Sequence, residues 1–271
     1  MNKKQKANFF DEKTISRFGD QWNLFTKNED YYGSLNCLAD ICGPFFDIRD
    51  FENKNICDIG SGTGRIVQML INAGAAFVTA IEPSISFKIL EKNIAPFKNR
   101  VRLIQATAET LKEENKFDYI VSFGVLHHVV NPACIVQVAY KALLPNGKFV
   151  IWLYGLEGNI LYLSLLIPLR KITTRLSKNT LLNVSKMLLF IANIYLKCCY
   201  FLPLPLHRYF KNYFAKVNSS QRILYIFDQL NPTYAKYYCK NEAYDLLAKQ
   251  GFKNIQLYHR HGYSWTVIGE K

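Results

Sequence analysis

The sequence has little that would build a metal site or a disulfide framework. Its seven cysteines form an odd set without C-x-x-C spacing, and its five histidines include no cluster that would complete a zinc site. Such cysteines are typical of thiols in a reducing compartment. The basic N-terminus, MNKKQKANFFDEK, is not followed by the apolar core of a signal peptide. We therefore expect no bound metal and a cytoplasmic location.

Internal repeats and low-complexity tracts are also absent. Of the 271 residues, 49% are hydrophobic and 20% are charged, which is ordinary for a folded protein and argues against a largely disordered chain. This length is enough for one large α/β domain with an elaboration.

Three glycines are concentrated in five positions within the stretch NICDIGSGTGRIVQML, residues 55–70. The apolar run before them predicts a strand, and the helical spacing of the apolar residues after them predicts a helix. Gly60, Gly62 and Gly64 would let a ligand approach the main-chain N–H groups of the turn without a Cβ in the way. The stretch lacks the G-K-[ST] ending of a polyphosphate loop, and Arg65 stands where the dinucleotide fingerprint has its third glycine. The pattern favours a ligand with an adenosine but no pyrophosphate.

The following segments alternate between strand and helix patterns. A second strand ends at Glu82, 22 residues after Gly60, where a carboxylate can accept hydrogen bonds from both hydroxyls of a ribose. Pro83 and Ser84 are expected to start the next helix. Such alternation predicts a parallel sheet covered on both faces, with a ligand crevice at the carboxyl ends of its strands. Further strands are expected at residues 101–106 and 119–123, and another after a turn at residues 145–147.

The ordered series DIGSGTG, IEPS, QATAETL, FDYIVSFGVLHHV and LLPNGKFVIW, within residues 54–154, resembles class I S-adenosylmethionine-dependent methyltransferases of the small-molecule type, with a core like that of ubiquinone and menaquinone methyltransferases. The resemblance implies an α/β, Rossmann-like, doubly wound, mostly parallel sheet of seven strands. It places a helical lid at residues 1–50, the cofactor-binding core at 51–156, and the last helix with an antiparallel closing hairpin at 236–271. S-adenosylmethionine would be the cofactor and S-adenosylhomocysteine the product.

The resemblance assigns the methionine end of the cofactor to two loops. After the first strand, the implied contacts are Asp58, Gly60, Ser61, Gly62 and Gly64. After the fourth strand, Ser122 and Phe123 would flank the methionine moiety and the sulfonium.

The adenosine end would lie at the second and third strands. Glu82 would hold the ribose, with Pro83 and Ser84 beside the adenine. Thr107 stands where the family usually has an acid that contacts the adenine amine. Adenine recognition would then rest on the Ala108 N–H and on stacking.

Histidines are the first candidates on the acceptor side, although a base is needed only where the acceptor must lose a proton. His128 follows the fourth expected strand, where the family commonly has a histidine, and it is either a catalytic base or a loop anchor. Its neighbour His127 is expected to be structural. In the C-terminal hairpin, strand alternation would place His259, His261 and Tyr263 on one face if no bulge intervenes. This is either a functional face, with His261 as a catalytic candidate, or a packed aromatic edge.

Two further segments supply candidates near the crevice. The stretch FDQLNPTYAKYY offers side chains that would either contact substrate or pack on the core: Asp228, Asn231, Tyr234 and Tyr237. Of these, Tyr234 is also a catalytic candidate. The stretch ISRFGDQWNLF predicts a helix with one apolar face, which would close the ligand site as a lid or pack in the core. Its candidate closing residues, with one beyond it, are Arg17, Trp22 and Tyr32.

Residues 157–235 exceed what this fold needs and are expected to form a helical insertion that caps the substrate site. Residues 157–217 hold nine basic side chains and one acid, so they carry eight of the thirteen net positive charges. Helices are expected near 159–170, 179–200 and 206–216, with apolar stripes beside basic residues. No stretch has the ~20 clean residues of a membrane span, since Lys197 and two prolines interrupt the most apolar one. We expect this segment to contact an anionic membrane, peripherally at its inner face, or to present a solvated basic rim.

These features predict methyl transfer to a small or lipid-linked acceptor. The segments WLYGLEGN, NPTYAKYY and HRHGYSWTVIG resemble methyltransferases of cell-surface saccharide, lipid or secondary-metabolite biosynthesis. The alternatives are an RNA or DNA methyltransferase, and a noncatalytic module that binds S-adenosylmethionine. Nucleic acid is disfavoured because LHHVVNPA, rather than an N-P-P-[FYW] motif, follows the fourth strand, and because the basic residues alternate with leucine and isoleucine rather than stacking aromatics.

Overall fold

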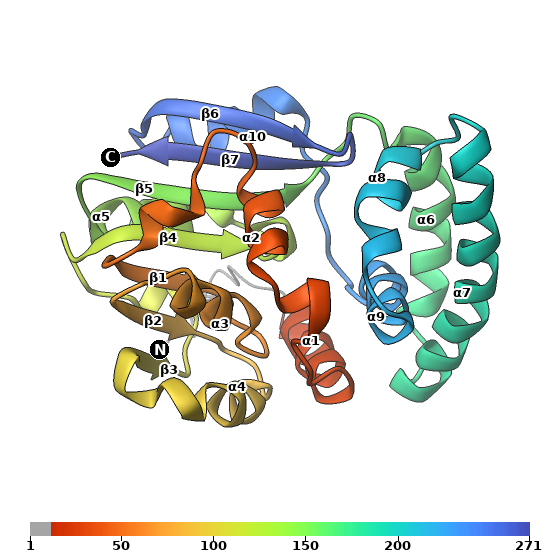
Figure 1. Ribbon diagram of the computed structural model, residues 1–271, viewed down its shortest axis with the longest axis horizontal. Helices are drawn as coiled ribbons and strands as arrows, with labels where there is room; N and C mark the ends of the chain where they lie inside the picture. Colours follow the sequence, from red (N-terminus) through yellow and green to blue (C-terminus); the bar gives the residue numbers. More distant parts are fainter. Residues whose placement is uncertain (1–11) are drawn as a thin grey trace, which may run out of the picture.

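The computed structural model describes residues 12–271, so the expected start of the lid at residues 1–11 lies outside the described residues. Figure 1 shows an α/β core beside a bundle of helices, with helix α1 (Glu12–Leu24) between them. The sheet has seven strands in the order β3-β2-β1-β4-β5-β7-β6, and it confirms the expected fold class. The strands are β1 Asn55–Ile59, β2 Phe77–Ile81, β3 Val101–Ile104, β4 Phe117–Phe123, β5 Leu143–Tyr154, β6 Lys253–Arg260 and β7 Ser264–Glu270.

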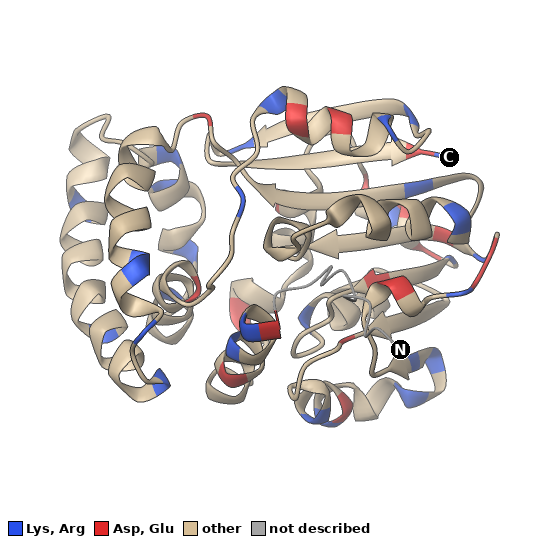
Figure 2. Cartoon of the chain, turned by 180° about the vertical axis from the view of Figure 1, so that it is seen from behind, with Lys and Arg blue, Asp and Glu red and all other residues tan. Residues whose placement is uncertain are grey.

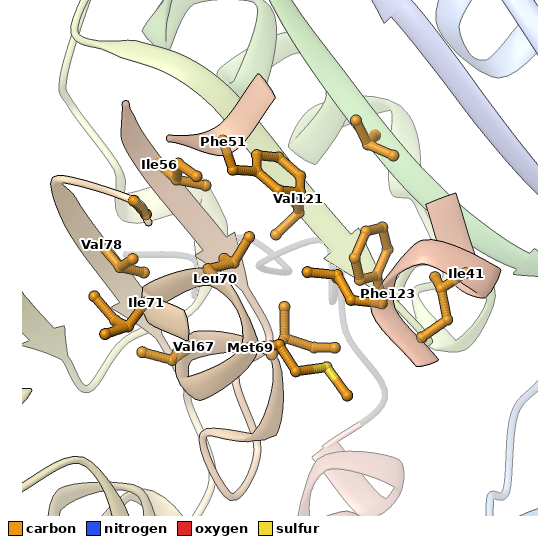
Figure 3. Close-up of a cluster of buried hydrophobic side chains, with 14 of the residues drawn as sticks. Ile41, Phe51, Ile56, Val67, Met69, Leu70, Ile71, Val78, Val121 and Phe123 are labelled. Atoms are coloured by element: carbon orange, nitrogen blue, oxygen red, sulfur yellow. The ribbon is translucent and has the colours of Figure 1, made fainter. Parts of the chain in front are cut away.

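Strands β1 to β5 are parallel, and β7 pairs antiparallel with both β5 and β6, as expected for a closing hairpin. The near-continuous burial of the central strands follows from the helices that cover both faces of the sheet. One face packs against α2 (Leu35–Cys42), α3 (Arg65–Asn72) and α4 (Phe87–Ile94), and the other against α5 (Pro132–Ala142) and α10 (Lys240–Ala248). Figure 3 shows Val67 and Leu70 of α3 packed over Ile56, Val78 and Val121 from three neighbouring strands.

Three helices of the insertion lie close to those expected: α6 (Ile160–Thr173), α7 (Lys178–Phe201) and α8 (His207–Asn212). A fourth, α9 (Ser219–Leu230), was not among the expected helices. The expectation that no segment suits a membrane span needs correction. Helix α7 has 24 residues, and an 18-residue window within it has a mean hydropathy of 1.4, so by length and composition alone it could cross a membrane. The helix begins at Lys178 and ends at Phe201, so Pro203 and Pro205, which were expected to interrupt the apolar stretch, lie outside it.

Two element boundaries differ from the expectation. Helix α4 begins at Phe87 rather than at Pro83, because the Ser84 main-chain N–H donates to the Glu82 carboxylate and holds the intervening residues in a turn. Strand β5 begins before the 145–147 turn, which is accommodated as an irregularity in its pairing with β4, with Asn146 at a φ of +64°.

A buried ion pair fastens the closing hairpin to α2. The Arg260 guanidinium, 1% exposed, donates to the Asp40 carboxylate and lies over the ring of Tyr213 at 4.3 Å. His261 Nε2 lies 2.8 Å from the other oxygen of Asp40. Burial raises the pKa of Asp40, but the hydrogen bond with His261 and the charge of Arg260 outweigh it and leave that pKa below its usual value.

We expect Asp40→Ala to lower the free energy of unfolding at pH 7 by about 3–5 kcal/mol, since it leaves the buried Arg260 guanidinium without its carboxylate partner. The control is Asp245→Ala, which removes an exposed pair with Lys249 and should change stability by less than about 1 kcal/mol. Urea denaturation compares them. Because the pKa of Asp40 is lower in the folded than in the unfolded state, its contribution is present above the unfolded pKa and is lost as the pH falls through the folded pKa. Equal stability of the two variants at pH 7 would contradict this account.

Candidate functional site

A large cavity lies at the carboxyl ends of the central strands. Its volume is about 840 Å³, and it sits where the strand order reverses between β1 and β4, the position at which doubly wound sheets bind ligands. Loops after β1, β2 and β4 form one wall, α1 forms a second, and the helical insertion forms a third. The expected cofactor residues that line it are Gly60, Ser61, Gly62, Glu82, Pro83, Ser84 and Phe123.

The carboxylate of Glu82 holds two of these loops together. Its Oε2 accepts a hydrogen bond from the Gly62 main-chain N–H at 2.8 Å, and its Oε1 accepts one from the Ser84 N–H at 2.9 Å. Glu82 is buried and lines the cavity. A carboxylate has about four lone-pair sites, so each oxygen can still accept a second hydrogen bond, as two ribose hydroxyls would require.

The glycines of the β1 loop are required by its backbone shape and by close neighbours. Gly60 has a φ of +80°, and a Cβ there would lie 2.4 Å from the Val125 side chain. Gly62 has a φ of +54°, and a Cβ there would lie 3.2 Å from the indole nitrogen of Trp22. The loop is therefore a tight cradle that the lid helix covers.

The expected use of the loop's main-chain N–H groups needs correction. The amides of Gly60 and Ser61 both donate to the Ile81 carbonyl, that of Gly62 donates to Glu82, and that of Gly64 donates to the Ser61 carbonyl. These amides build the loop. They are not left over for a ligand, because Ile81 and Glu82 at the end of β2 accept three of these hydrogen bonds and Ser61 of the loop itself accepts the fourth.

Asp58 lies at the end of β1, directly below this loop. It is 1% exposed, and its Oδ2 has no hydrogen-bond partner among the described residues. Burial raises the pKa of Asp58 to about 7. Asp58 does not line the cavity wall, but a buried carboxylate oxygen without a partner is costly, so this oxygen would suit a donor that a ligand brings to it. The amino group of the methionine moiety is such a donor.

Other expected cofactor residues lie outside the cavity wall. Gly64 packs on α4, and Ser122 is fully buried with its Oγ donating to the Ile59 carbonyl at 3.3 Å. Thr107 donates to Glu109 at 2.8 Å, and it and Ala108 do not line the cavity. The adenine contacts expected of Thr107 and Ala108 therefore stay predictions.

His128 lines the cavity from the loop after β4 and packs on Phe18 of α1. Its Nδ1 lies 2.9 Å from the Tyr234 carbonyl oxygen, which can only accept, so Nδ1 carries a proton and Nε2 has a free lone pair when the ring is neutral. Burial lowers the pKa of His128 to about 4, so the ring is neutral near pH 7. Tyr234 reaches this histidine through its main chain, and its side chain does not line the cavity. His127 is buried and stacks on Tyr154, as expected of a structural residue.

Sequence reasoning missed a polar cluster next to His128. The Tyr154 hydroxyl, at the end of β5, donates to Asp228 at 2.7 Å and accepts from Gln229 Nε2 at 2.8 Å. Burial and the Asp228 charge raise the pKa of Tyr154 well above its usual value, so this hydroxyl keeps its proton. Tyr237 stacks on Tyr154, and all four side chains line the cavity. Asp228 and Tyr237 were expected near the crevice, whereas Tyr154 reads in sequence as one more apolar strand residue.

The expected common face of His259, His261 and Tyr263 is wrong. Strand β6 ends at Arg260, and the positive φ of His261, +49°, breaks the alternation at the turn. His259 stacks on Trp265 at 4.3 Å, and His261 pairs with Asp40 outside the cavity wall. Of the three, only Tyr263 lines the cavity, so the structure does not bring His261 to the candidate site.

Helix α1 covers the cavity as a lid and is tied to the insertion. Arg17 donates to the Asn231 carbonyl at 2.6 Å and to the Thr174 carbonyl at 3.0 Å, while Asn231 Nδ2 donates back to the Arg17 carbonyl. Trp22 and Tyr32 line the cavity. The apolar face expected of this helix therefore points into the site, and its polar side holds the lid closed.

This arrangement defines a class: a Rossmann-like sheet in which a glycine cradle and a strand-end carboxylate form a nucleoside site without a polyphosphate loop. Comparison with known proteins agrees. Residues 57–151 match the family described as a methyltransferase domain. A tRNA U34 carboxymethyltransferase of Pseudoalteromonas atlantica is 29% identical over 114 residues, covering 41% of this chain and 35% of that protein. A ubiquinone biosynthesis O-methyltransferase of Hydrogenovibrio crunogenus is 27% identical over 173 residues, covering 62% and 68%.

Among solved structures, human N-acetylserotonin methyltransferase in complex with S-adenosylmethionine shares the fold, with a TM-score of 0.50, 12% identity, and coverage of 94% of this chain and 55% of that one. The chain spans about a third of the length of the tRNA-modifying relative. These findings support a class I S-adenosylmethionine-dependent methyltransferase core over residues 57–151, with S-adenosylmethionine as its cofactor.

We expect Gly62→Val to abolish binding of S-adenosylhomocysteine, because the β-branched side chain is strained at a φ of +54° and would enter the space beside Trp22. The matched control is Gly262→Val, which places the same side chain at a φ of +75° with no atom within 4 Å of its Cβ. Isothermal titration calorimetry measures both. Binding by the Gly62→Val protein, or a preference of the unmodified protein for NAD, would contradict the assignment.

A second prediction concerns pH. The affinity for S-adenosylhomocysteine should rise roughly tenfold between pH 6 and pH 8, as the Asp58 carboxylate loses its proton near pH 7 and becomes an acceptor for the ligand's ammonium group. Asp58→Asn should flatten this dependence. The control is Asp118→Asn, which lies near the start of β4, away from the cavity at the carboxyl ends of the strands, and should preserve the dependence. An unchanged slope in the Asp58→Asn protein would refute the contact.

Proposed function

We propose that this protein is an S-adenosylmethionine-dependent methyltransferase acting on a small or lipid-linked acceptor with an apolar body and a polar group that takes the methyl. One observation carries the proposal. A single cavity has Gly62 and Glu82 in one wall and the aliphatic side chains Leu165, Leu188 and Ile191 of the insertion in another. Its volume of about 840 Å³ lies at the upper end of the range for small-molecule sites.

Residues in different parts of the cavity wall would have different roles. The β1 loop and Glu82 would hold S-adenosylmethionine, which supplies an electrophilic methyl group when bound. The lid residues Phe18 and Trp22 exclude water from the space above that loop. Fixing the acceptor in line can supply much of the rate, ~7–11 kcal/mol in favourable cases.

Polar groups stand between the cofactor end and the aliphatic end of the cavity. The Tyr154–Asp228–Gln229 cluster would orient the acceptor's polar group, and His128 Nε2 would accept its proton where one must be lost. The O-methyltransferase relative supports an acceptor of this kind. The tRNA-modifying relative supports the alternative, an RNA acceptor.

The test is to incubate the purified protein with methyl-labelled S-adenosylmethionine and separate lipid, RNA and polar-metabolite extracts. Label in the lipid or polar-metabolite fraction is expected, and Glu82→Gln should abolish it. Label confined to RNA would favour the nucleic-acid alternative. Label in no fraction, with S-adenosylhomocysteine still bound, would favour a noncatalytic binding module.

With an acceptor in hand, His128→Gln should lower kcat by roughly 10²-fold or more if the histidine takes the proton. The matched control is His207→Gln, because His207 Nδ1 also lies 2.9 Å from a carbonyl oxygen but the ring does not line the cavity. Since burial lowers the pKa of His128 to about 4, kcat/KM should show no loss from this group between pH 8 and pH 6. A drop in rate that follows a group of pKa 6.5, and disappears in His128→Gln, would contradict this environment.

A further inference from the structure

The largest exposed apolar side chains of the described chain gather on the insertion. Phe201 is 86% exposed, Leu165 72%, and Ile160 and Phe190 71% each. Patches of this kind mark interaction sites when they are contiguous. Here they lie on α6 and α7, and Figure 1 shows α7 at the outer edge of the molecule, away from the sheet.

The exposed side chains of α7 form one stripe. Met187, Phe190, Ile194 and Phe201 recur at helical spacing, so they share a face of the helix. The buried residues of the same helix, which include Leu181 and Leu196, occupy its other side, and there it packs against α8 and α9. The stripe therefore has no partner within the described chain.

Basic residues border this stripe without acids to balance them. Lys186 and Lys197 are exposed beside it, and neither takes part in an ion pair among residues 12–271. From residue 157 to residue 217 the chain has one acidic side chain, Glu157, against nine basic ones. Figure 2 shows blue residues along the insertion helices and almost no red ones. An apolar face with cationic borders is complementary to the surface of an anionic bilayer.

The cavity opens toward the same helices. Leu161, Leu165, Leu169 and Ile191 all line the cavity, yet each is more than a third exposed. Ile191 directly follows Phe190 of the stripe in α7, so the aliphatic end of the site lies close to the exposed apolar surface of that helix.

The connections of the insertion favour lying on a membrane over crossing it. The insertion leaves the sheet after β5 and returns through α10 to β6 and β7, and β7 pairs directly with β5. Both ends of the insertion are therefore anchored to one sheet. Helix α7 also keeps its buried side on α9, which a spanning helix would have to give up.

We propose that the exposed face of α6 and α7 docks on an anionic phospholipid bilayer, with the mouth of the cavity against the lipid. This interaction goes beyond the proposed function and does not depend on it. Apolar side chains of the stripe would enter the headgroup boundary, and the lysines would pair with lipid phosphates.

The test is sedimentation of the full chain with vesicles of phosphatidylcholine containing 30% phosphatidylglycerol, compared with vesicles of phosphatidylcholine alone. The protein should pellet with the anionic vesicles and bind the neutral ones at least tenfold more weakly. Lys186→Glu with Lys197→Glu should weaken anionic-vesicle binding by roughly tenfold or more. The matched control, Lys240→Glu with Lys253→Glu on the core, makes the same change in net charge and should bind like the unmodified protein.

A second variant, Phe190→Ser with Ile194→Ser and Phe201→Ser, should lose binding to both vesicles, whereas Phe45→Ser with Tyr244→Ser on the core should not. S-adenosylhomocysteine binding by each variant separates loss of docking from loss of fold. Pelleting of the stripe variant like the unmodified protein would overturn the proposal. The proposal would also be overturned if the unmodified protein bound neither kind of vesicle and formed a dimer in analytical ultracentrifugation, while the stripe variant stayed monomeric. The exposed face would then bind a second copy of this chain.

Discussion

The pair of hydrogen bonds that the Glu82 carboxylate accepts is the contact on which the candidate site depends. It joins the loop after β1, through Gly62, to the turn after β2, through Ser84. Without an acceptor there, each of the two buried N–H groups would be unsatisfied and would lower the stability of the fold by about 1–3 kcal/mol. The two loops would also lose the contact that joins them. The same oxygens keep lone pairs for a ligand, so one side chain both shapes the cradle and can recognise a ribose.

The two halves of the site are coupled by the lid. Helix α1 covers the cradle with Trp22 and also holds the insertion, where Gln21 donates to Asp228 at 2.8 Å and Arg17 bonds the Asn231 carbonyl. Asp228 in turn accepts from Tyr154 of the sheet. Movement of the lid would therefore disturb the cofactor end and the acceptor end together, which is a physical reason for both ligands to bind in one closed state.

Local patterns predicted the parts of the fold that local chemistry decides. The strand, glycine turn and helix at residues 55–72, and the insertion helices, follow from the spacing of apolar residues. The hairpin face was mispredicted, because His261 adopts a positive φ that no alternation rule contains. The loop amides were misassigned because three of the four donate to Ile81 or Glu82 at the end of the neighbouring strand, and the Gly64 amide donates to Ser61 within the loop. Tyr154 and Arg260 were missed, because their partners Asp228 and Asp40 lie 74 and 220 residues away in sequence.

The most direct test of the central claim is a crystal structure of the protein grown with S-adenosylhomocysteine. The account predicts the ligand in the cavity between β1 and β4, with both ribose hydroxyls on Glu82 and its amino group toward Asp58. A ligand bound elsewhere on the chain, or a Glu82 carboxylate that keeps its amide contacts while the ribose lies beyond hydrogen-bond reach, would contradict it.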